Sequence, residues 1–152
     1  MREPDGVSMM LPDHGRPAPL LTRMVAGEDS SCLLVDDDVL YLSFLAEVFR
    51  ARGYRTLTAS GGEAALRLAR RHGPTFVLLD VGMPGPDGFE VLRALRRHDA
   101  TRAALIVMLS GRDRAADIFA ALHGGADDYV VKPIRPDDLV DRVHALLWRD
   151  DN

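Results

Sequence analysis

Phe76-Val77-Leu78-Leu79-Asp80 places four apolar residues directly before an acidic one. An unbroken apolar run of this length is typical of a strand that is buried on both faces, as in the middle of a parallel sheet. Residues 32–35 and 105–109 are unbroken apolar runs as well. The sequence therefore predicts three central strands in one sheet whose two faces are both covered.

Two further stretches predict strands at the edges of this sheet. Residues 55–59 alternate polar and apolar side chains, and residues 129–131 form a short run. A half-polar strand and a short strand both suit positions with a neighbour on one side only. With right-handed crossovers, the five strands predict an α/β fold: a doubly wound, five-stranded parallel sheet with strand order 2-1-3-4-5.

Helical patterns occupy the segments between the strands. Residues 39–52 bring Leu42, Leu45 and Phe49 to one face at helical spacing. The other helices are expected to begin at residues that cap or open helices, namely Ser60 with Glu63, Asp87 with Glu90, Asp113 and Pro136. The helix after Asp113 carries apolar residues at helical spacing up to Gly124-Gly125, namely Ala115, Ile118, Phe119 and Leu122.

The composition limits the classes of partner. The chain has 152 residues, a length that fits a single domain with one core. It has one cysteine and a formal net charge of −4 at pH 7. This charge predicts no basic surface for nucleic acid or anionic lipid, so we expect no direct nucleic-acid partner and no membrane partner. No long apolar run or secretory signal is present, and the expected location is the cytoplasm.

The first 30 residues differ from the rest of the chain. They contain four prolines and three glycines and show neither helical nor strand periodicity. We therefore expect a flexible N-terminal extension over residues 1–30, a domain over residues 31–149 and a C-terminal tail over residues 150–152.

Reactive side chains follow four of the five predicted strands. Because the carboxyl ends of parallel strands meet at one edge of a sheet, these side chains are expected in one pocket. One of them, Lys132, is the only lysine among the 19 basic residues. The set consists of Asp36, Asp37 and Asp38 after the first strand, Asp80 after the third, Ser110 after the fourth and Lys132 after the fifth.

These residue types suit one kind of chemistry. Crowded carboxylates repel one another unless a cation neutralises them, and a site made of oxygen ligands suits Mg²⁺. Beside such a cation, an aspartate can act as a nucleophile towards a phosphoryl group and form an acyl phosphate. A serine hydroxyl and a compact lysine ammonium can hold the phosphoryl oxygens. The pattern therefore predicts Mg²⁺-dependent phosphoryl transfer to an aspartate.

Other interpretations of the same residues stay open. Asp38 is expected to cap a helix, and Asp127-Asp128 to cap or solvate a turn. An aspartate-nucleophile phosphatase of the haloacid dehalogenase type would also use strand-end Asp, Ser and Lys with Mg²⁺, although Leu40 stands where its first motif has Thr or Val. A P-loop enzyme is excluded, because the chain has no Gly-x-x-x-x-Gly-Lys segment.

Four segments, in order, resemble the receiver domain of bacterial two-component response regulators. They are LLVDDD at 33–38, LLDVGMPGPDG at 78–88, MLSG at 108–111 and GADDYVVKP at 125–133. The resemblance covers residues 31–149 and implies a flavodoxin-like three-layer sandwich. It implies a phosphoacceptor signalling domain that catalyses its own phosphorylation and dephosphorylation, and not an enzyme that acts on a separate substrate.

The resemblance also assigns roles to individual residues. Asp80 would be the phosphoacceptor, supplied by a sensor histidine kinase or a histidine phosphotransfer protein. Ser110 and Lys132 would hold the phosphoryl oxygens, and Ser110 with Tyr129 would form a switch. The Mg²⁺ ligands would be Asp36 through water, Asp37, Asp80 and the backbone carbonyl of Gly82.

The expected output surface covers residues 113–148, where it would contact a downstream partner or an attached effector. A phosphorylation-dependent homodimer is left open, as is the choice between a stand-alone receiver and a domain of a longer regulator. Two positions depart from the family pattern. Gly82 has no side chain to shield the phosphoryl group, and Arg112 is large and cationic. The lifetime of the phosphoryl group is therefore open too.

Overall fold

The computed structural model describes residues 31–148. The predicted extension over residues 1–30 and the predicted tail over residues 150–152 lie outside this range. Among the described residues, the helices are too short or too polar to cross a membrane.

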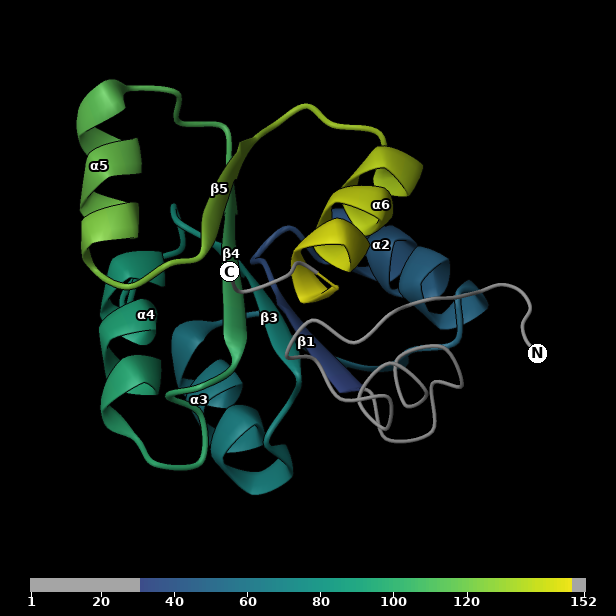
Figure 1. Ribbon diagram of the computed structural model, residues 1–152, viewed down its shortest axis with the longest axis horizontal. Coiled ribbons are helices and arrows are strands. Elements are labelled where there is room, and N and C mark those ends of the chain that lie inside the picture. Colours follow the sequence, from purple (N-terminus) through teal and green to yellow (C-terminus); the bar gives the residue numbers. More distant parts are fainter. Residues whose placement is uncertain (1–30, 149–152) are drawn as a thin grey trace.

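Strands and helices alternate along the described part of the chain (Figure 1). The strands are β1 (Ser31–Val35), β2 (Arg55–Ala59), β3 (Phe76–Asp80), β4 (Leu105–Ser110) and β5 (Asp128–Val131). The helices are α2 (Val39–Ala51), α3 (Gly62–His72), α4 (Gly88–Arg97), α5 (Ala115–His123) and α6 (Pro136–Leu147). Each strand differs from its predicted range by one residue at most.

The five strands form one parallel sheet in the order β2-β1-β3-β4-β5. This confirms the predicted fold class and strand order. Every residue of β1 and β3 is buried, whereas β2 exposes Arg55 and Thr58. The apolar runs therefore occupy the centre of the sheet and the half-polar strand occupies an edge, because an edge strand has solvent beside it.

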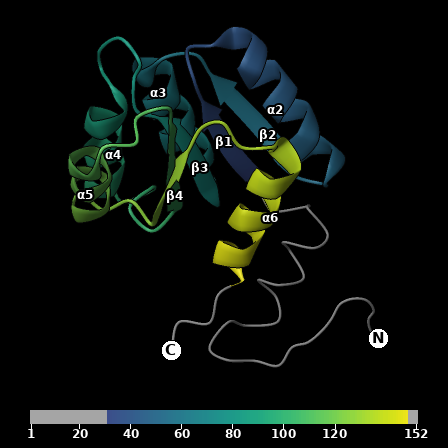
Figure 2. The same cartoon turned by 90° about the horizontal axis from the view of Figure 1, so that it is seen from above.

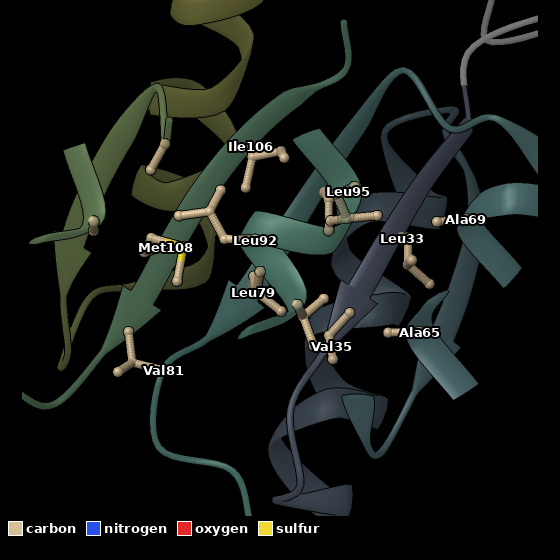
Figure 3. Packing of buried hydrophobic residues seen from close by; sticks show 14 of the residues in the cluster. Leu33, Val35, Ala65, Ala69, Leu79, Val81, Leu92, Leu95, Ile106 and Met108 are labelled. Carbon is tan, nitrogen blue, oxygen red and sulfur yellow. The ribbon is translucent and has the colours of Figure 1, made fainter. Parts of the chain in front are cut away.

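Helices cover both faces of the sheet and give three layers (Figures 1 and 2). α2 and α6 cover one face, where Phe49, Phe76 and Leu139 are fully buried. α3, α4 and α5 cover the other face, where strand residues such as Ile106 pack near Leu95 of α4 (Figure 3). The two clusters share the sheet, so the carboxyl ends of the strands are held by packing from both sides.

Two predicted helix caps are confirmed. At the start of α2, the Asp38 carboxylate accepts a hydrogen bond from the backbone N–H of Tyr41 at 3.2 Å. At the start of α4, Asp87 accepts from the N–H of Glu90 at 3.0 Å, and Glu90 accepts from the N–H of Asp87 at 2.8 Å. These bonds satisfy backbone donors that the first turn of a helix leaves free.

The predicted capping box of Ser60 with Glu63 is wrong. The N-cap of α3 is Gly61, and no side chain of residues 31–148 hydrogen-bonds at that position. Close packing accompanies this start: a Cβ on Gly62 would lie 2.6 Å from the carbonyl oxygen of Pro86. The helix therefore begins one residue after the sequence pattern suggested, where glycine allows the close approach.

α5 differs from its prediction in its cap and in its buried residues. Its N-cap is Arg114 rather than Asp113, and within the described range no side chain caps it. Its buried residue is Ala121, whereas Phe119 and Leu122 are 67% and 46% exposed. α5 lies beside the edge strand β5 (Figure 1), so only a narrow strip of the helix reaches the core.

Candidate functional site

The side chains predicted at the strand ends do come together at the carboxyl edge of the sheet. Asp80 and Ser110 are the last residues of β3 and β4, and both are buried. Asp36 follows β1 directly and Lys132 follows β5. The backbone N–H of Lys132 donates to the carbonyl of Ser110 at 2.8 Å, so pairing of β4 and β5 holds this edge in register.

Three carboxylates form a cluster at this edge. Asp36, Asp37 and Asp80 each place one oxygen within 4.8 Å of the other two. Asp36 and Asp80 are 4% and 8% exposed, whereas Asp37 faces solvent. Carboxylate oxygens in a partly open cluster are the ligands that Mg²⁺ prefers, because the ion keeps several waters. The residues present therefore fit the predicted metal.

Asp38 caps a helix, as predicted, and does not join the carboxylate cluster. Its carboxylate caps α2, and its own backbone N–H donates to Oδ1 of Asp36 at 2.9 Å. The start of α2 therefore orients the Asp36 carboxylate towards the cluster, while the Asp38 side chain serves the helix.

Lys132 lies between the two buried carboxylates. Its Nζ is 2.8 Å from Oδ2 of Asp36 and 3.9 Å from Oδ1 of Asp80. Burial on its own would lower the pKa of Lys132, but the hydrogen bond to Asp36 and the two negative charges outweigh it, and the net pKa is raised. The ammonium therefore stays protonated beside Asp80.

The environment of Asp80 destabilises its negative charge. Burial raises the pKa of Asp80 above its usual value, and the charge of Asp36 raises it further. The charge of Lys132 and a backbone hydrogen bond from Gly82 oppose this rise without cancelling it. A carboxylate that is poorly solvated in this way gains from any further cation, which agrees with the chemistry of the cluster.

Ser110, Arg112 and Tyr129 are joined by hydrogen bonds. The backbone N–H of Arg112 donates to Oγ of Ser110 at 3.1 Å, and the Tyr129 hydroxyl donates to the carbonyl of Arg112 at 2.9 Å. Tyr129 is 6% exposed, so its ring is buried in this structure. The backbone of Arg112 therefore connects Ser110 of the site to Tyr129 of β5.

The two departures from the family pattern are neighbours in space. Gly82 is exposed, and a Cβ at this position would lie 3.8 Å from Nη2 of Arg112. The Arg112 guanidinium thus lies next to the space that a side chain at position 82 would enter. The proposed role of the Gly82 carbonyl as a metal ligand stays a prediction.

Sequence reasoning missed one neighbour of this site. The ring of Tyr41, in the first turn of α2, has its centroid 4.7 Å from Nζ of Lys132. No motif includes this position. The only available signal was its place in the helix that follows the acidic run, since the first turn of that helix has to pass close to the cluster.

Known proteins resemble this chain in sequence and in structure. It is 41% identical over 119 residues to the transcriptional regulatory protein AfsQ1 of Streptomyces coelicolor, covering 78% of this chain and 52% of AfsQ1. It is also 41% identical over 120 residues to the DNA-binding response regulator MtrA of Mycobacterium tuberculosis, covering 79% and 51%. The chain spans about half the length of these relatives.

A solved structure also resembles this chain. The crystal structure of a putative response regulator from Chloroflexus aurantiacus superposes with a TM-score of 0.73 at 35% sequence identity. The match covers 79% of this chain and 98% of the other.

These relatives correct one prediction. The net charge led us to expect no direct nucleic-acid partner, but MtrA is named as a DNA-binding regulator and AfsQ1 as a transcriptional one. The exclusion was wrong, because the charge was counted over a chain that corresponds to only about half of such a regulator.

The comparisons also decide between the two aspartate-based alternatives. A family model described as the response regulator receiver domain matches residues 32–144. This range includes every strand-end residue of the site. The haloacid dehalogenase alternative is therefore set aside, and the chain belongs to the response regulator receiver domain family.

Proposed function

We propose that this chain accepts a phosphoryl group on Asp80 from a phosphohistidine of a sensor histidine kinase or a histidine phosphotransfer protein, in a Mg²⁺-dependent reaction. The observation that carries the proposal is the position of Asp80, in a carboxylate cluster and 3.9 Å from the only lysine ammonium of the chain. Family membership supports the same role.

Asp80, Lys132 and Ser110 each have a separate role in the transfer. An oxygen of Asp80 attacks phosphorus to form an acyl phosphate, while the P–N bond of the donor breaks and its electron pair stays on the imidazole nitrogen. Lys132 offers its ammonium to a phosphoryl oxygen, and the Ser110 hydroxyl donates to another. Asp80 then carries the phosphoryl group itself, so the domain is modified once rather than turning over a separate substrate.

The carboxylate cluster would hold the metal for this step. Bound Mg²⁺ supplies positive charge to the phosphoryl oxygens. The proposed protein ligands are Asp36 through water, Asp37, Asp80 and the backbone carbonyl of Gly82.

The entrance to the site offers contacts for a donor protein. Val39 and Leu40 are 60% and 84% exposed, and they follow the acidic cluster directly at the start of α2. Apolar side chains exposed beside a reactive site are suited to contact with another protein, because such contact removes them from water.

Mass spectrometry tests the acceptor. Incubation with acetyl phosphate and Mg²⁺ should add the mass of one phosphoryl group, EDTA should prevent the addition, and Asp80→Ala should abolish it. Asp99→Ala is the matched control, since Asp99 is an exposed carboxylate away from the cluster. Labelling of Asp80→Ala to the same extent as the wild type would refute the assignment.

We further propose that phosphorylation is transmitted through Arg112 to α5 and the output surface. The Ser110 hydroxyl would donate to a phosphoryl oxygen, and the reorientation this requires would alter the hydrogen bond that Oγ accepts from the N–H of Arg112. The carbonyl of Arg112 is the acceptor for Tyr129. Arg114, two residues later, is the N-cap of α5. The DNA-binding and transcriptional relatives support an output on transcription.

Amide NMR spectra with and without beryllofluoride and Mg²⁺ test this route. We expect shift changes in α5 and β5 as well as in the site, and smaller changes in α5 for Tyr129→Phe, which removes the hydrogen bond to Arg112. Changes confined to the loops of the site would contradict the proposed route while leaving the acceptor role intact.

A further inference from the structure

We propose that Tyr41 is a positioning residue for phosphoryl transfer: the face of its ring holds the Lys132 ammonium in place between Asp36 and Asp80. This inference rests on the proposed phosphoacceptor function, because that function requires Lys132 to meet a phosphoryl group on Asp80. It concerns a residue that no strand-end motif includes.

The contact is made at short range and in a partly dry environment. Nζ of Lys132 lies 4.7 Å from the centroid of the Tyr41 ring, and the Lys132 side chain is 25% exposed. An ammonium within about 6 Å of an aromatic centroid is attracted by the negative face of the ring, and the attraction grows as water is removed. Lys132 is thus held by two carboxylates and one ring.

The hydroxyl of Tyr41 does not explain the presence of the ring. That hydroxyl is buried and has no hydrogen-bond partner among residues 31–148. A buried hydroxyl without a partner lowers stability, so an aliphatic side chain could cover the apolar cluster that α2 and α6 form with the sheet at less cost. What the aromatic ring offers, and an aliphatic side chain does not, is attraction for the ammonium.

The position of Lys132 shows why a third contact is useful. Its ammonium lies 1.1 Å nearer to Asp36 than to Asp80, from the two distances of 2.8 Å and 3.9 Å. To meet a phosphoryl group on Asp80 it has to leave Asp36 in part. Attraction to a ring face is less directional than a hydrogen bond, so Tyr41 can keep hold of the ammonium during this shift.

The composition of the chain makes the contact directly observable. Lys132 is the only lysine in the 152 residues, so labelling with ¹³C,¹⁵N-lysine gives the side-chain NMR signals of this residue alone. Protons that lie over an aromatic face are shifted upfield by the ring current. We expect the Lys132 side-chain protons to be shifted upfield in the wild type.

Substitutions at Tyr41 separate the ring from the hydroxyl. Tyr41→Phe keeps the ring and should keep both the upfield shift and, within twofold, the initial rate of labelling by acetyl phosphate and Mg²⁺. Tyr41→Leu should lose the shift and slow labelling by about three- to tenfold, the range expected for one partly desolvated contact of this type. Phe44→Leu is the matched control, because Phe44 is an exposed aromatic residue on the same helix.

Each alternative outcome has a definite meaning. The positioning role is overturned if Tyr41→Leu labels at the wild-type rate, if it slows without a change in the Lys132 signals, or if Tyr41→Phe is as slow as Tyr41→Leu. Tyr41→Met provides a second aliphatic variant if thermal unfolding shows that Tyr41→Leu does not fold. A wild type that takes no phosphoryl group would refute the proposed function instead, and the lysine signals would still report the contact.

Discussion

α4 and α5 cover the same face of the sheet (Figure 1), yet they are anchored in different ways. α4 buries Val91, Leu92 and Leu95 and starts with a capping box. α5 buries Ala121 and leaves Phe119 67% exposed. Both segments form helices of similar length, so the difference lies in packing and not in helix formation. A helix with few buried contacts costs little free energy to move.

The start of α4 is also fixed against the site. The backbone N–H of Gly88 donates to the carbonyl of Val81 at 3.1 Å, and a Cβ on Gly88 would overlap the carbonyl oxygen of Asp80. Only glycine fits this approach without displacement of the backbone. α4 therefore supports the proposed acceptor, whereas α5 has fewer buried side chains to hold it against the sheet.

Arg96, in the last turn of α4, joins the ends of both helices. Its side chain makes four hydrogen bonds, to the carbonyls of Arg102, Ala104 and Gly125 and to the carboxylate of Asp127. Gly125 and Asp127 lie in the loop between α5 and β5. The end of α5 is thus tied to α4, whereas no side chain of the described residues caps its start.

The largest expected effect compares one leucine from each helix. Leu95→Ala should lower the free energy of unfolding by about 2–5 kcal/mol, because it leaves a cavity in a closed core. Leu122→Ala should lower it by about 0.5 kcal/mol or less, because Leu122 is 46% exposed. Urea unfolding of both variants measures the difference. Equal losses would show that α5 is anchored as firmly as α4.

The next effect concerns the connection between the helices. Arg96→Ala should lower the free energy of unfolding by about 1.5–3 kcal/mol, because it removes a charged donor from several carbonyls at once. It should also speed amide hydrogen exchange in the loop after α5. Arg97→Ala, at an exposed neighbouring position, is the control and should leave both quantities nearly unchanged. Unchanged exchange in Arg96→Ala would mean that the loop is held by other contacts.

The smallest expected effect compares the two helix starts. Asp87→Ala removes the capping box of α4 and should lower the free energy of unfolding by about 1 kcal/mol. Asp113→Ala should have no measurable effect, because Arg114 and not Asp113 is the N-cap of α5. Thermal unfolding of the two variants under the same conditions provides the comparison. A similar loss for Asp113→Ala would mean that Asp113 caps α5, as the sequence pattern predicted.

The candidate site was largely predictable because its residues are tied to strand ends. A run such as Phe76–Asp80 shows both that a strand is central and where it ends, and a parallel sheet brings such ends together. Tyr41 could not be found in this way. Its contact with Lys132 joins α2 to the residue that follows β5, and the position of the Tyr41 ring depends on how α2 packs against the sheet.

Sequence patterns were enough to predict the strand order, the central position of the apolar strands and one edge that carries Asp36, Asp37, Asp80, Ser110 and Lys132. These follow from local patterns, since alternation, apolar runs and capping residues act within a few neighbouring positions. The exposure of Phe119 and Leu122 and the contact of the Tyr41 ring with Lys132 depend instead on how the helices pack in the folded chain. The physical reason is that helical spacing shows that a helix has an apolar side, whereas burial of that side depends on what the rest of the fold places against it.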